Sequence, residues 1–372
     1  MKRIQIVIFL IFITLNKLFA QDVKIYHSLQ EAFSDSTNVK SLDLSENNLV
    51  ELPVEILHLK NLEDIDLEAN PNLNLGEALH LLSQLKHLKS LGLGRNKLSD
   101  IPTYIAALKN LDDLSLEDNE FTDIPATIKK LHIKSLFLYG DKMETLHLKK
   151  GDLADLTDIN LCVNKFTIFP TQLSVLPNLK QITIWHNKIR FIPRAISQFK
   201  QLDSLELDNN ELSKLPPEIA LLKKLHHLSI RFNHLKSQDI KEVYRITSLT
   251  GLDLEGNNIE IISTRIGNLK NLKYFNISDN PITELPFEFS NLQKLQILGL
   301  NNLHDLDWAH AFKLLQKLPK LTALGISGMG LRKMPEGFEE LRQVKSFWIT
   351  NNSFDKEEWT RIKKLLPNAK FE

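Results

Sequence analysis

One unit of 23 residues recurs along almost the whole chain, and this repeat restricts the possible folds more than any other feature of the sequence. Its clearest copy, at residues 202–224, reads LDSLELDNNELSKLPPEIALLKK, with leucine at positions 1, 4, 6, 11 and 14 and asparagine at position 9. Most steps between copies are 23 residues, and the others are 22, 24 or 26 residues. Fourteen copies begin at Val39, Leu62, Leu88, Leu111, Ile133, Leu156, Leu179, Leu202, Leu225, Leu249, Leu272, Leu295, Leu321 and Val344. A period in the twenties with this leucine spacing predicts a solenoid, in which each repeat adds one turn to a stack.

Each repeat is expected to begin with a short strand that has one buried face. Positions 4 and 6 are apolar and alternate with outward positions 3, 5 and 7, which is the period of a half-buried strand. Position 9 is mostly asparagine, which can turn inward and bond backbone donors and acceptors of adjacent turns. The expected ladder consists of Asn47, Asn70, Asn96, Asn119, Asn164, Asn187, Asn210, Asn233, Asn257, Asn280 and Asn352. Asp141 takes this position in repeat 5, whereas Leu303 and Met329 interrupt the ladder, so we expect local distortion near repeats 12 and 13.

A second motif places proline after an apolar residue at the end of the strand side. Proline fixes φ and has no backbone donor, so it ends the strand side and turns the chain onto the opposite side of the repeat. The motif occurs at Pro53, Pro102, Pro125, Pro170, Pro193, Pro216, Pro286 and Pro335. With these motifs the chain resembles leucine-rich repeat proteins, in particular the Ras-suppressor-like type that is common in bacterial proteins. The resemblance implies an α/β fold: a curved right-handed solenoid with a parallel sheet on its concave face and helical caps at both ends.

The two ends of the chain carry signals that differ from the repeats. Residues 1–20 combine Lys2 and Arg3 with an apolar run and end in Ala20, which is typical of a signal peptide; an uncleaved membrane anchor is the alternative. We therefore expect an exported protein, in the periplasm, at the cell surface or in the medium. Residues 28–33 and 356–366 have helical spacing, as do the connections at 75–85, 239–246 and 306–318. These patterns assign residues 21–38 to an N-terminal cap, 39–355 to the repeat domain and 356–372 to a C-terminal helical cap.

Charge and cysteine content exclude several classes of protein. Removal of residues 1–20 takes away three basic residues and no acidic residue, which leaves 43 basic and 46 acidic residues and a net charge of −3. A nearly neutral chain gives no reason to expect nucleic acid or an anionic membrane as a partner. Cys162 is the only cysteine, so no disulfide bond forms within the chain. It occupies outward position 7 of its repeat, and we expect a small thiol at the surface.

The sequence contains no motif of a known catalytic site. A Gly-rich phosphate loop, a His-Glu-x-x-His pair and a nucleophile elbow are all missing from it. We therefore expect no enzyme activity, no cofactor and no metal. One alternative is left open by the acidic panel of repeats 1–4, where Asp64, Asp66, Glu68 and Asp113 could hold calcium or basic residues of a partner.

The outward strand positions provide the candidate binding surface. Strands of adjacent repeats stack about 4.8 Å apart, so positions 3, 5 and 7 form a continuous grid on the concave face. On the middle repeats this grid carries aromatic and charged side chains, and aromatic residues and arginine dominate the binding energy of protein interfaces. The expected partner-binding residues are Phe137, Tyr139, Trp185, His186, Glu206, Asp208, Arg231 and Phe232.

These patterns together indicate a non-enzymatic scaffold that binds a protein or peptide on its concave face. A rigid stack loses little conformational entropy on binding, which favours such a role. A structural spacer of the envelope or surface, in which each aromatic side chain only covers its neighbour's backbone, is one alternative. A glycan-binding surface module is another, because exposed tryptophan and tyrosine also stack on sugars.

Overall fold

The computed structural model describes residues 23–372, which form two compact units, one up to Leu116 and one from Glu117 to the end. The predicted signal peptide at residues 1–20 lies outside the described residues. Among the described helices, none has the length and apolar character needed to cross a membrane. The two units are built from the same kind of turn.

In each unit the strands follow one another in parallel, in chain order. The first unit contains β1 (Ile25–Tyr26), β2 (Ser41–Asp43), β3 (Asp64–Asp66), β4 (Ser90–Gly92) and β5 (Asp113–Ser115). The second contains β6 (Ser135–Phe137), β7 (Asp158–Asn160), β8 (Gln181–Thr183), β9 (Ser204–Glu206), β10 (His227–Ser229), β11 (Gly251–Asp253), β12 (Tyr274–Asn276), β13 (Ile297–Gly299), β14 (Ala323–Gly325), β15 (Ser346–Trp348) and β16 (Lys370–Phe371). Equivalent repeat positions pair in register, as in Leu205 of β9 with Leu228 of β10. The predicted leucine-rich repeat solenoid is therefore the observed fold.

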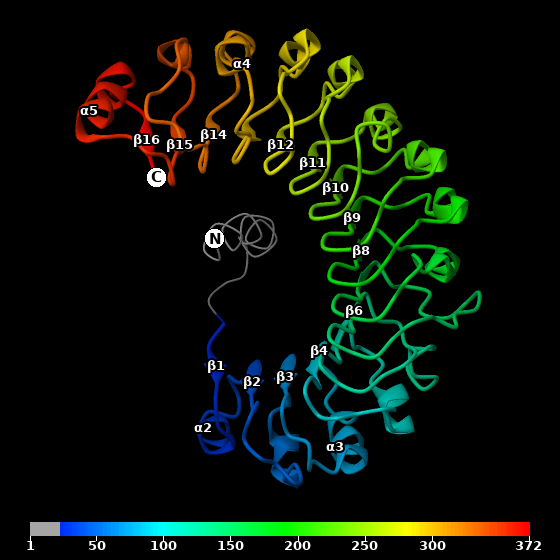
Figure 1. Cartoon of the computed structure of the whole chain (residues 1–372). Coiled ribbons are helices and arrows are strands. Elements are labelled where there is room, and N and C mark those ends of the chain that lie inside the picture. Colours follow the sequence, from blue (N-terminus) through cyan, green and yellow to red (C-terminus); the bar gives the residue numbers. More distant parts are fainter. Residues whose placement is uncertain (1–22) are drawn as a thin grey trace. The chain divides into compact units, whose positions relative to one another are not determined.

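Helical turns lie opposite the strands within each unit (Figure 1). The α-helices are α2 (Leu29–Ser34), α3 (Leu75–Leu82), α4 (Trp308–Leu315) and α5 (Lys356–Leu365). The 3₁₀ helices are η1 (Val54–His58), η2 (Thr103–Ala107), η3 (Thr171–Val175), η4 (Arg194–Gln198), η5 (Pro217–Leu221), η6 (Val243–Arg245), η7 (Thr264–Asn268), η8 (Phe287–Asn291) and η9 (Phe338–Glu340). Leucine, isoleucine and phenylalanine side chains from strands and helical turns fill the space between them and are almost completely buried.

The predicted helices agree with the structure except in one connection. The helix that we expected at 28–33 is α2, and Ser28 caps it by accepting a hydrogen bond from the Glu31 amide. The two 26-residue steps contain α3 and α4, and the expected C-terminal helix is α5. The connection at 239–246 is different, because only the short 3₁₀ helix η6 forms there. One extra residue in that repeat is not enough for a full α-helix.

The apolar–proline step starts six of the nine 3₁₀ helices in residues 23–372, whereas η6, η7 and η9 follow Glu242, Ser263 and Gly337. Proline stands directly before η1, η2, η3, η4, η5 and η8. Its carbonyl oxygen accepts the first hydrogen bond of the turn, as from the Ile56 amide to Pro53 at 3.0 Å. The fixed φ of proline suits this position, and its missing N–H is not needed there.

The asparagine ladder forms as the sequence predicts in the consecutive repeats from Asn164 to Asn280. The side-chain amide of Asn210 donates to the carbonyl oxygens of Ile184, Leu207 and Asp208 at 3.0–3.3 Å, while its Oδ1 accepts from the Ile189 amide at 3.0 Å. Each buried asparagine thereby joins two turns and leaves no strong hydrogen-bonding group unsatisfied. Asn47 is different: it is exposed, and its amide donates to Ser45 of its own repeat at 2.8 Å.

The expected distortion around Leu303 and Met329 is wrong. Strands β12, β13, β14 and β15 pair in unbroken register through both repeats. Leu303 and Met329 are themselves buried, so apolar packing fills the space that the asparagine side chain takes in other repeats. The ladder resumes at Asn352, whose amide reaches the carbonyl of Ile326 at 3.0 Å.

Position 8 of every repeat has a left-handed backbone. The φ angles there lie between 49° and 75°, and glycine takes this position in only three of the fourteen repeats. A left-handed φ is costly for a branched side chain, so Val163 at 53° is the least expected residue in the series. His186 and Phe232 occupy the same position with φ of 52° and 49°.

Asp141 replaces the ladder asparagine in a buried position, and its carboxyl group cannot donate unless it is protonated. Its Oδ1 accepts from the Phe121 amide at 3.1 Å, while Oδ2 is buried without a hydrogen-bond partner among the described residues. Burial raises the pKa of Asp141 to about 7, although the amides of Phe121 and Asn119 oppose this rise. The carboxyl group is thus more easily protonated in the folded than in the unfolded chain. Its contribution to stability is complete below about pH 4 and is lost as the pH rises through about 7.

We predict that Asp141→Asn stabilises the protein in a pH-dependent way. The free energies of unfolding of the variant and the native protein should be similar at pH 4 and differ by roughly 2–4 kcal/mol at pH 8, because the amide stays uncharged and still donates. Urea unfolding between pH 4 and pH 8 measures this difference. Asn164→Asp, in the next repeat, is the matched reverse change and should lose stability over the same pH range. A stability difference that does not change with pH would contradict a raised pKa of Asp141 in the folded protein.

Candidate binding face

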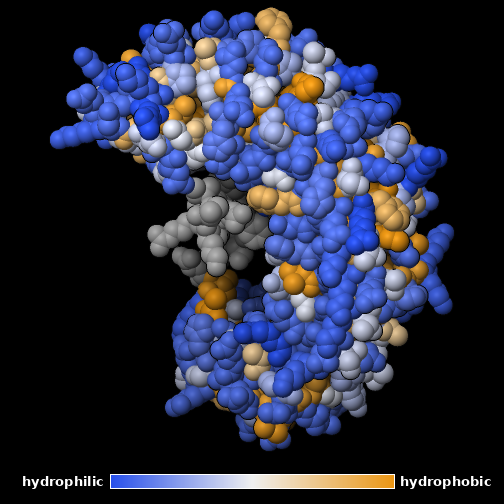
Figure 2. Space-filling model, viewed as in Figure 1, coloured by the Kyte–Doolittle hydropathy of each residue, from blue (hydrophilic) through white to orange (hydrophobic). Residues whose placement is uncertain are grey.

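The candidate surface lies in the second unit, on the outer face of strands β6–β12 and the residues that follow them. Side chains at positions 3, 5 and 7 point away from the core there, and their Cα partners are in register from strand to strand. Figure 2 shows that the visible surface is mostly hydrophilic, with hydrophobic residues in small separate patches. A cluster of rings on this outer strand face therefore differs from its surroundings.

Tyr139, Trp185 and His186 form an aromatic cluster. The ring centroids of Tyr139 and Trp185 are 5.8 Å apart at an angle of 57°, although one repeat lies between these residues. His186 meets Trp185 edge-on, with centroids 5.1 Å apart. Centroid distances in this range are favourable for aromatic pairs. Tyr139 and Trp185 are half-buried and His186 is exposed. The cluster therefore packs partly against its own chain and is still accessible to a partner.

The expectation of a surface thiol at Cys162 is wrong. Cys162 occupies position 7 of the repeat between Tyr139 and Trp185, and it is completely buried. Burial raises the pKa of the Cys162 thiol, an effect that the nearby carboxylates of Glu206 and Asp208 increase. Because cysteine is small, the two larger rings can lean toward one another above it.

The two phenylalanines of the predicted set differ in their relation to this cluster. Phe137 is 37% exposed, at the end of β6 and two residues before Tyr139 on the same face. Phe232 is half-buried and lies over the next repeat, where its ring would be 2.3 Å from a Cβ added to Gly256. Phe232 therefore covers backbone, whereas Phe137 extends the open aromatic surface.

Arg231 is the centre of an ion-pair network on β9–β12. Its guanidinium group contacts Asp208 at 2.7 Å, Glu255 at 3.7 Å and Asp253 at 3.9 Å, and its side chain is only 24% exposed. Tyr274 and Asn276 complete the network with hydrogen bonds to Asp253 at 2.6 and 3.3 Å. Arg231 was predicted to bind a partner, and its guanidinium group is already held by carboxylates of its own chain, which limits the contacts that it can offer.

Burial weakens the acidity of the carboxyl groups in this network. It raises the pKa of Glu206 to about 7 and that of Glu255 to about 8, and in both cases a neighbouring aspartate adds to the rise while Arg231 opposes it. Asp253 follows the same pattern, with a pKa of about 6. Four carboxyl groups surround one arginine here, and an added positive charge would favour their ionised forms, so this side of the aromatic cluster favours positive charge on a partner.

The structure brings together only part of the predicted set. Tyr139, Trp185 and His186 share ring contacts, Phe137 lies beside them along its strand, and Glu206 lies in the adjoining acidic region. Asp208 is buried and paired with Arg231, so neither side chain is free for a partner. Sequence reasoning missed the network of Asp253, Tyr274 and Asn276, although opposite charges at positions 5 and 7 of adjacent repeats were a visible signal.

The acidic panel of the first unit is also partly neutralised. Arg95 pairs with Glu68 and with Glu46, the latter at 2.7 Å. The Ser41 hydroxyl donates to Asp64 at 2.7 Å. Throughout residues 23–372, no group of three or more His, Cys, Asp or Glu side chains is arranged to hold a metal ion.

Comparison with known proteins agrees with the repeat architecture. A family model described as leucine rich repeat matches residues 14–71, 154–212 and 200–259, and a second model of the same description matches residues 271–292. A solved leucine-rich repeat protein of Leptospira interrogans is 30% identical to this chain, with a TM-score of 0.70. The alignment covers 95% of this chain and 100% of that protein.

Two more distant structures share the fold. An internalin from Listeria monocytogenes is 21% identical, with a TM-score of 0.55 and coverage of 85% of this chain and 82% of the internalin. A TDR receptor is 24% identical, with a TM-score of 0.61 and coverage of 92% of this chain and 62% of the receptor. A search of curated proteins found no match. No catalytic family is indicated by these comparisons.

We predict that the aromatic pair protects Cys162 from thiol reagents. The native protein should react with a maleimide only on unfolding, because the thiol is buried and its pKa is raised. Trp185→Ala and Tyr139→Ala should each raise the rate of modification about tenfold or more, as read by mass spectrometry of the intact chain. Phe232→Ala removes a ring from the same face at a distance from the thiol and should leave the rate unchanged. Equal rates in all four proteins would show that the rings do not cover Cys162.

Proposed function

This chain belongs to the leucine-rich repeat family, and we propose that it is a non-enzymatic scaffold that binds a protein or peptide on the outer strand face of its second unit. The observation that carries the proposal is the aromatic cluster, in which Tyr139 and Trp185 are 5.8 Å apart across an intervening repeat. The leucine-rich repeat fold is typical of protein–protein interaction modules, which supports the same class of function.

The cluster has the properties of an interface hot spot. Its rings are large and amphipathic, they are held by neighbouring side chains, and they remain accessible beside exposed Phe137. Binding to side chains that are already ordered costs little conformational entropy. A few such aromatic residues commonly supply most of the binding energy of an interface.

The charge beside the cluster restricts the partner. Asp208 and Asp253 flank the single arginine, and the carboxyl groups of Glu206 and Glu255, whose pKa values are raised, would ionise more readily beside a positive charge. A partner segment that combines an apolar or aromatic anchor with lysine or arginine would satisfy both regions, since a cation also binds well to the face of tryptophan or tyrosine. The proposed ligand is therefore a basic segment of a protein.

The proposal includes export of the protein. It rests on the signal-peptide pattern of residues 1–20, with positive charge before a short apolar run and a small residue at the end. We expect the protein recovered from the source cells to begin at Gln21, as read by N-terminal sequencing of the fraction outside the cytoplasm. Recovery of a cytoplasmic chain that retains residues 1–20 would contradict export and leave the binding proposal untouched.

We predict that Tyr139→Ala with Trp185→Ala abolishes partner capture. Purified native and variant proteins serve as immobilised baits, and cross-linked partners are compared by quantitative mass spectrometry. Truncation of two hot-spot rings should reduce specific capture about tenfold or more. Phe191→Ala with Phe287→Ala removes two exposed rings outside this face and is the matched control. Arg231 stays unchanged in both variants, because its ion pairs hold the face together.

The outcomes of this experiment separate the function classes. Loss of a partner in the first variant alone would support the proposed site. Equal capture by both variants would contradict the site. Capture that simple saccharides displace would assign the face to glycans instead of a protein. Thermal unfolding of each variant verifies that the fold is intact.

A further inference from the structure

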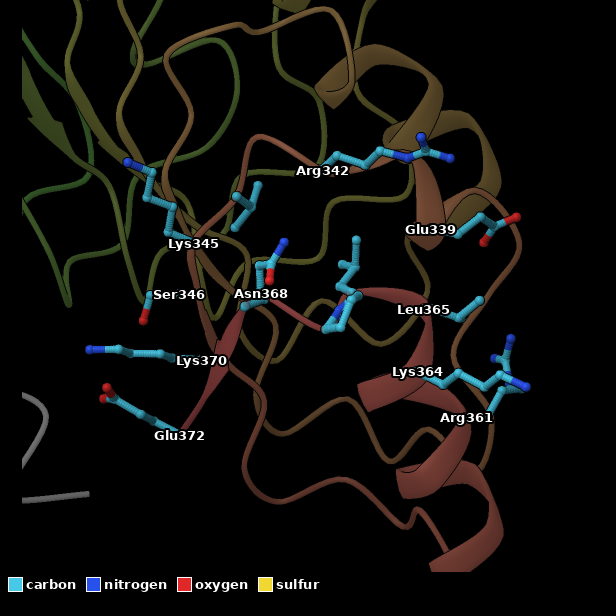
Figure 3. Close-up of a pocket in the computed structure, with 14 residues that line it drawn as sticks. Glu339, Arg342, Lys345, Ser346, Arg361, Lys364, Leu365, Asn368, Lys370 and Glu372 are labelled. Carbon is cyan, nitrogen blue, oxygen red and sulfur yellow. The ribbon is translucent and has the colours of Figure 1, made fainter.

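A second surface in the same unit has a different shape and the opposite charge. An open pocket of about 1280 Å³ lies among the segment before β15, helix α5 and the chain that leads into β16 (Figure 3). Pockets for small molecules usually measure about 300–1,000 Å³, so this one has room for a larger ligand. It is distant in sequence from the aromatic cluster and shares no residue with it.

The lining of the pocket contains five cations and two carboxylates, those of Glu339 and Glu372. Arg342, Lys345, Lys364 and Lys370 are exposed, and none of them forms an ion pair within residues 23–372. A fifth cation, Arg361, is already bound to Glu358 at 2.7 Å and to the Met334 carbonyl at 2.9 Å. The chain as a whole has equal numbers of basic and acidic residues, so this local excess of positive charge is a property of the pocket.

The cations are spread over two sides of the pocket. Figure 3 shows Lys345 and Lys370 on one side, and Arg342 and Lys364 on the other, with Asn368 between the two groups. Glu339 lies on the side of Arg342 and Lys364 and Glu372 on the side of Lys345 and Lys370, so two cations outnumber one carboxylate on each side. The apolar part of the lining consists of Val344, Leu365, Leu366, Pro367 and Ala369. A single phosphate needs donors that converge on one point, which this arrangement does not provide.

We propose that this pocket binds an acidic peptide segment of a partner protein, with carboxylates at both ends of an apolar centre. The two pairs of cations would hold the carboxylates, and the apolar floor would bury the central side chains. Charge complementarity provides attraction and orientation, and the apolar contact excludes water from the centre. This site is additional to the aromatic face, and it does not depend on that face binding anything.

A fluorescent hexapeptide, Glu-Glu-Leu-Leu-Glu-Glu with blocked ends, tests the proposal by fluorescence anisotropy on the purified full chain. We expect saturable binding that weakens with added salt, because exposed charges are screened. Lys345→Glu with Lys364→Glu alters one cation on each side and should weaken binding about tenfold or more. Lys200→Glu with Lys270→Glu changes the net charge equally, at exposed lysines elsewhere in the unit, and should have little effect.

Further arms identify the ligand class. Glu-Glu-Ser-Ser-Glu-Glu should bind more weakly, since it lacks the apolar centre, and Lys-Lys-Leu-Leu-Lys-Lys should not bind. The Tyr139→Ala, Trp185→Ala variant should bind the acidic hexapeptide like the native protein, so failure of one site is distinguishable from failure of the other. Arg342→Ala with Lys370→Ala is a second pocket variant in case the first does not fold.

Several results would overturn the proposal. Equal losses in the pocket variant and the Lys200, Lys270 control would show only non-specific attraction. Full competition by pyrophosphate at the peptide's concentration would indicate a small-anion site. Concentration-dependent self-association in sedimentation velocity, lost in the pocket variant, would make the occupant a second copy of this chain. Absence of saturable binding at low salt would exclude an acidic peptide.

Discussion

Each turn of this chain depends on the next turn for the hydrogen bonds of its own backbone. The ladder asparagines show this dependence directly: Asn210 bonds the Ile184 carbonyl and the Ile189 amide of the preceding repeat. A turn of 23 residues is too small to bury its own leucines, so its core and its polar backbone are completed by its neighbours. The register of the strands is consistent with these hydrogen bonds and apolar contacts between neighbouring repeats.

The same spacing determines what the outer strand face can offer. Strands lie so close that many side chains rest on the following repeat, as Phe232 does above Gly256 and His227 does above Gly251. Such side chains cover backbone and offer little surface to a partner. Tyr139 and Trp185 differ, because the small Cys162 between them lets their rings meet and remain partly open. One small residue in the grid thus produces an aromatic platform.

Much of this could be predicted from the sequence. The positions of leucine, asparagine and proline in the repeat predicted the strands, the asparagine ladder and the turns that begin after proline. These predictions were reliable because the same pattern recurs in most repeats. Local signals also located α2 and α5, where Ser28 and the apolar spacing of residues 356–366 are sufficient. Single-residue expectations were less successful: Leu303 and Met329 cause no distortion, because their own packing replaces the missing amides.

The sequence by itself determined the fold and which side chains leave the strands outward, since both depend on periodicity. Tertiary structure decided which of those side chains remain available. Arg231 and Asp208 point outward and yet pair with one another at 2.7 Å, Cys162 is completely buried, and Asp141 becomes a weak acid through burial. The cations of the C-terminal pocket come from separate elements that meet only in the fold. Whether an outward side chain can contact a partner depends on its burial and on its contacts in the folded chain. The repeat pattern of the sequence does not specify these contacts.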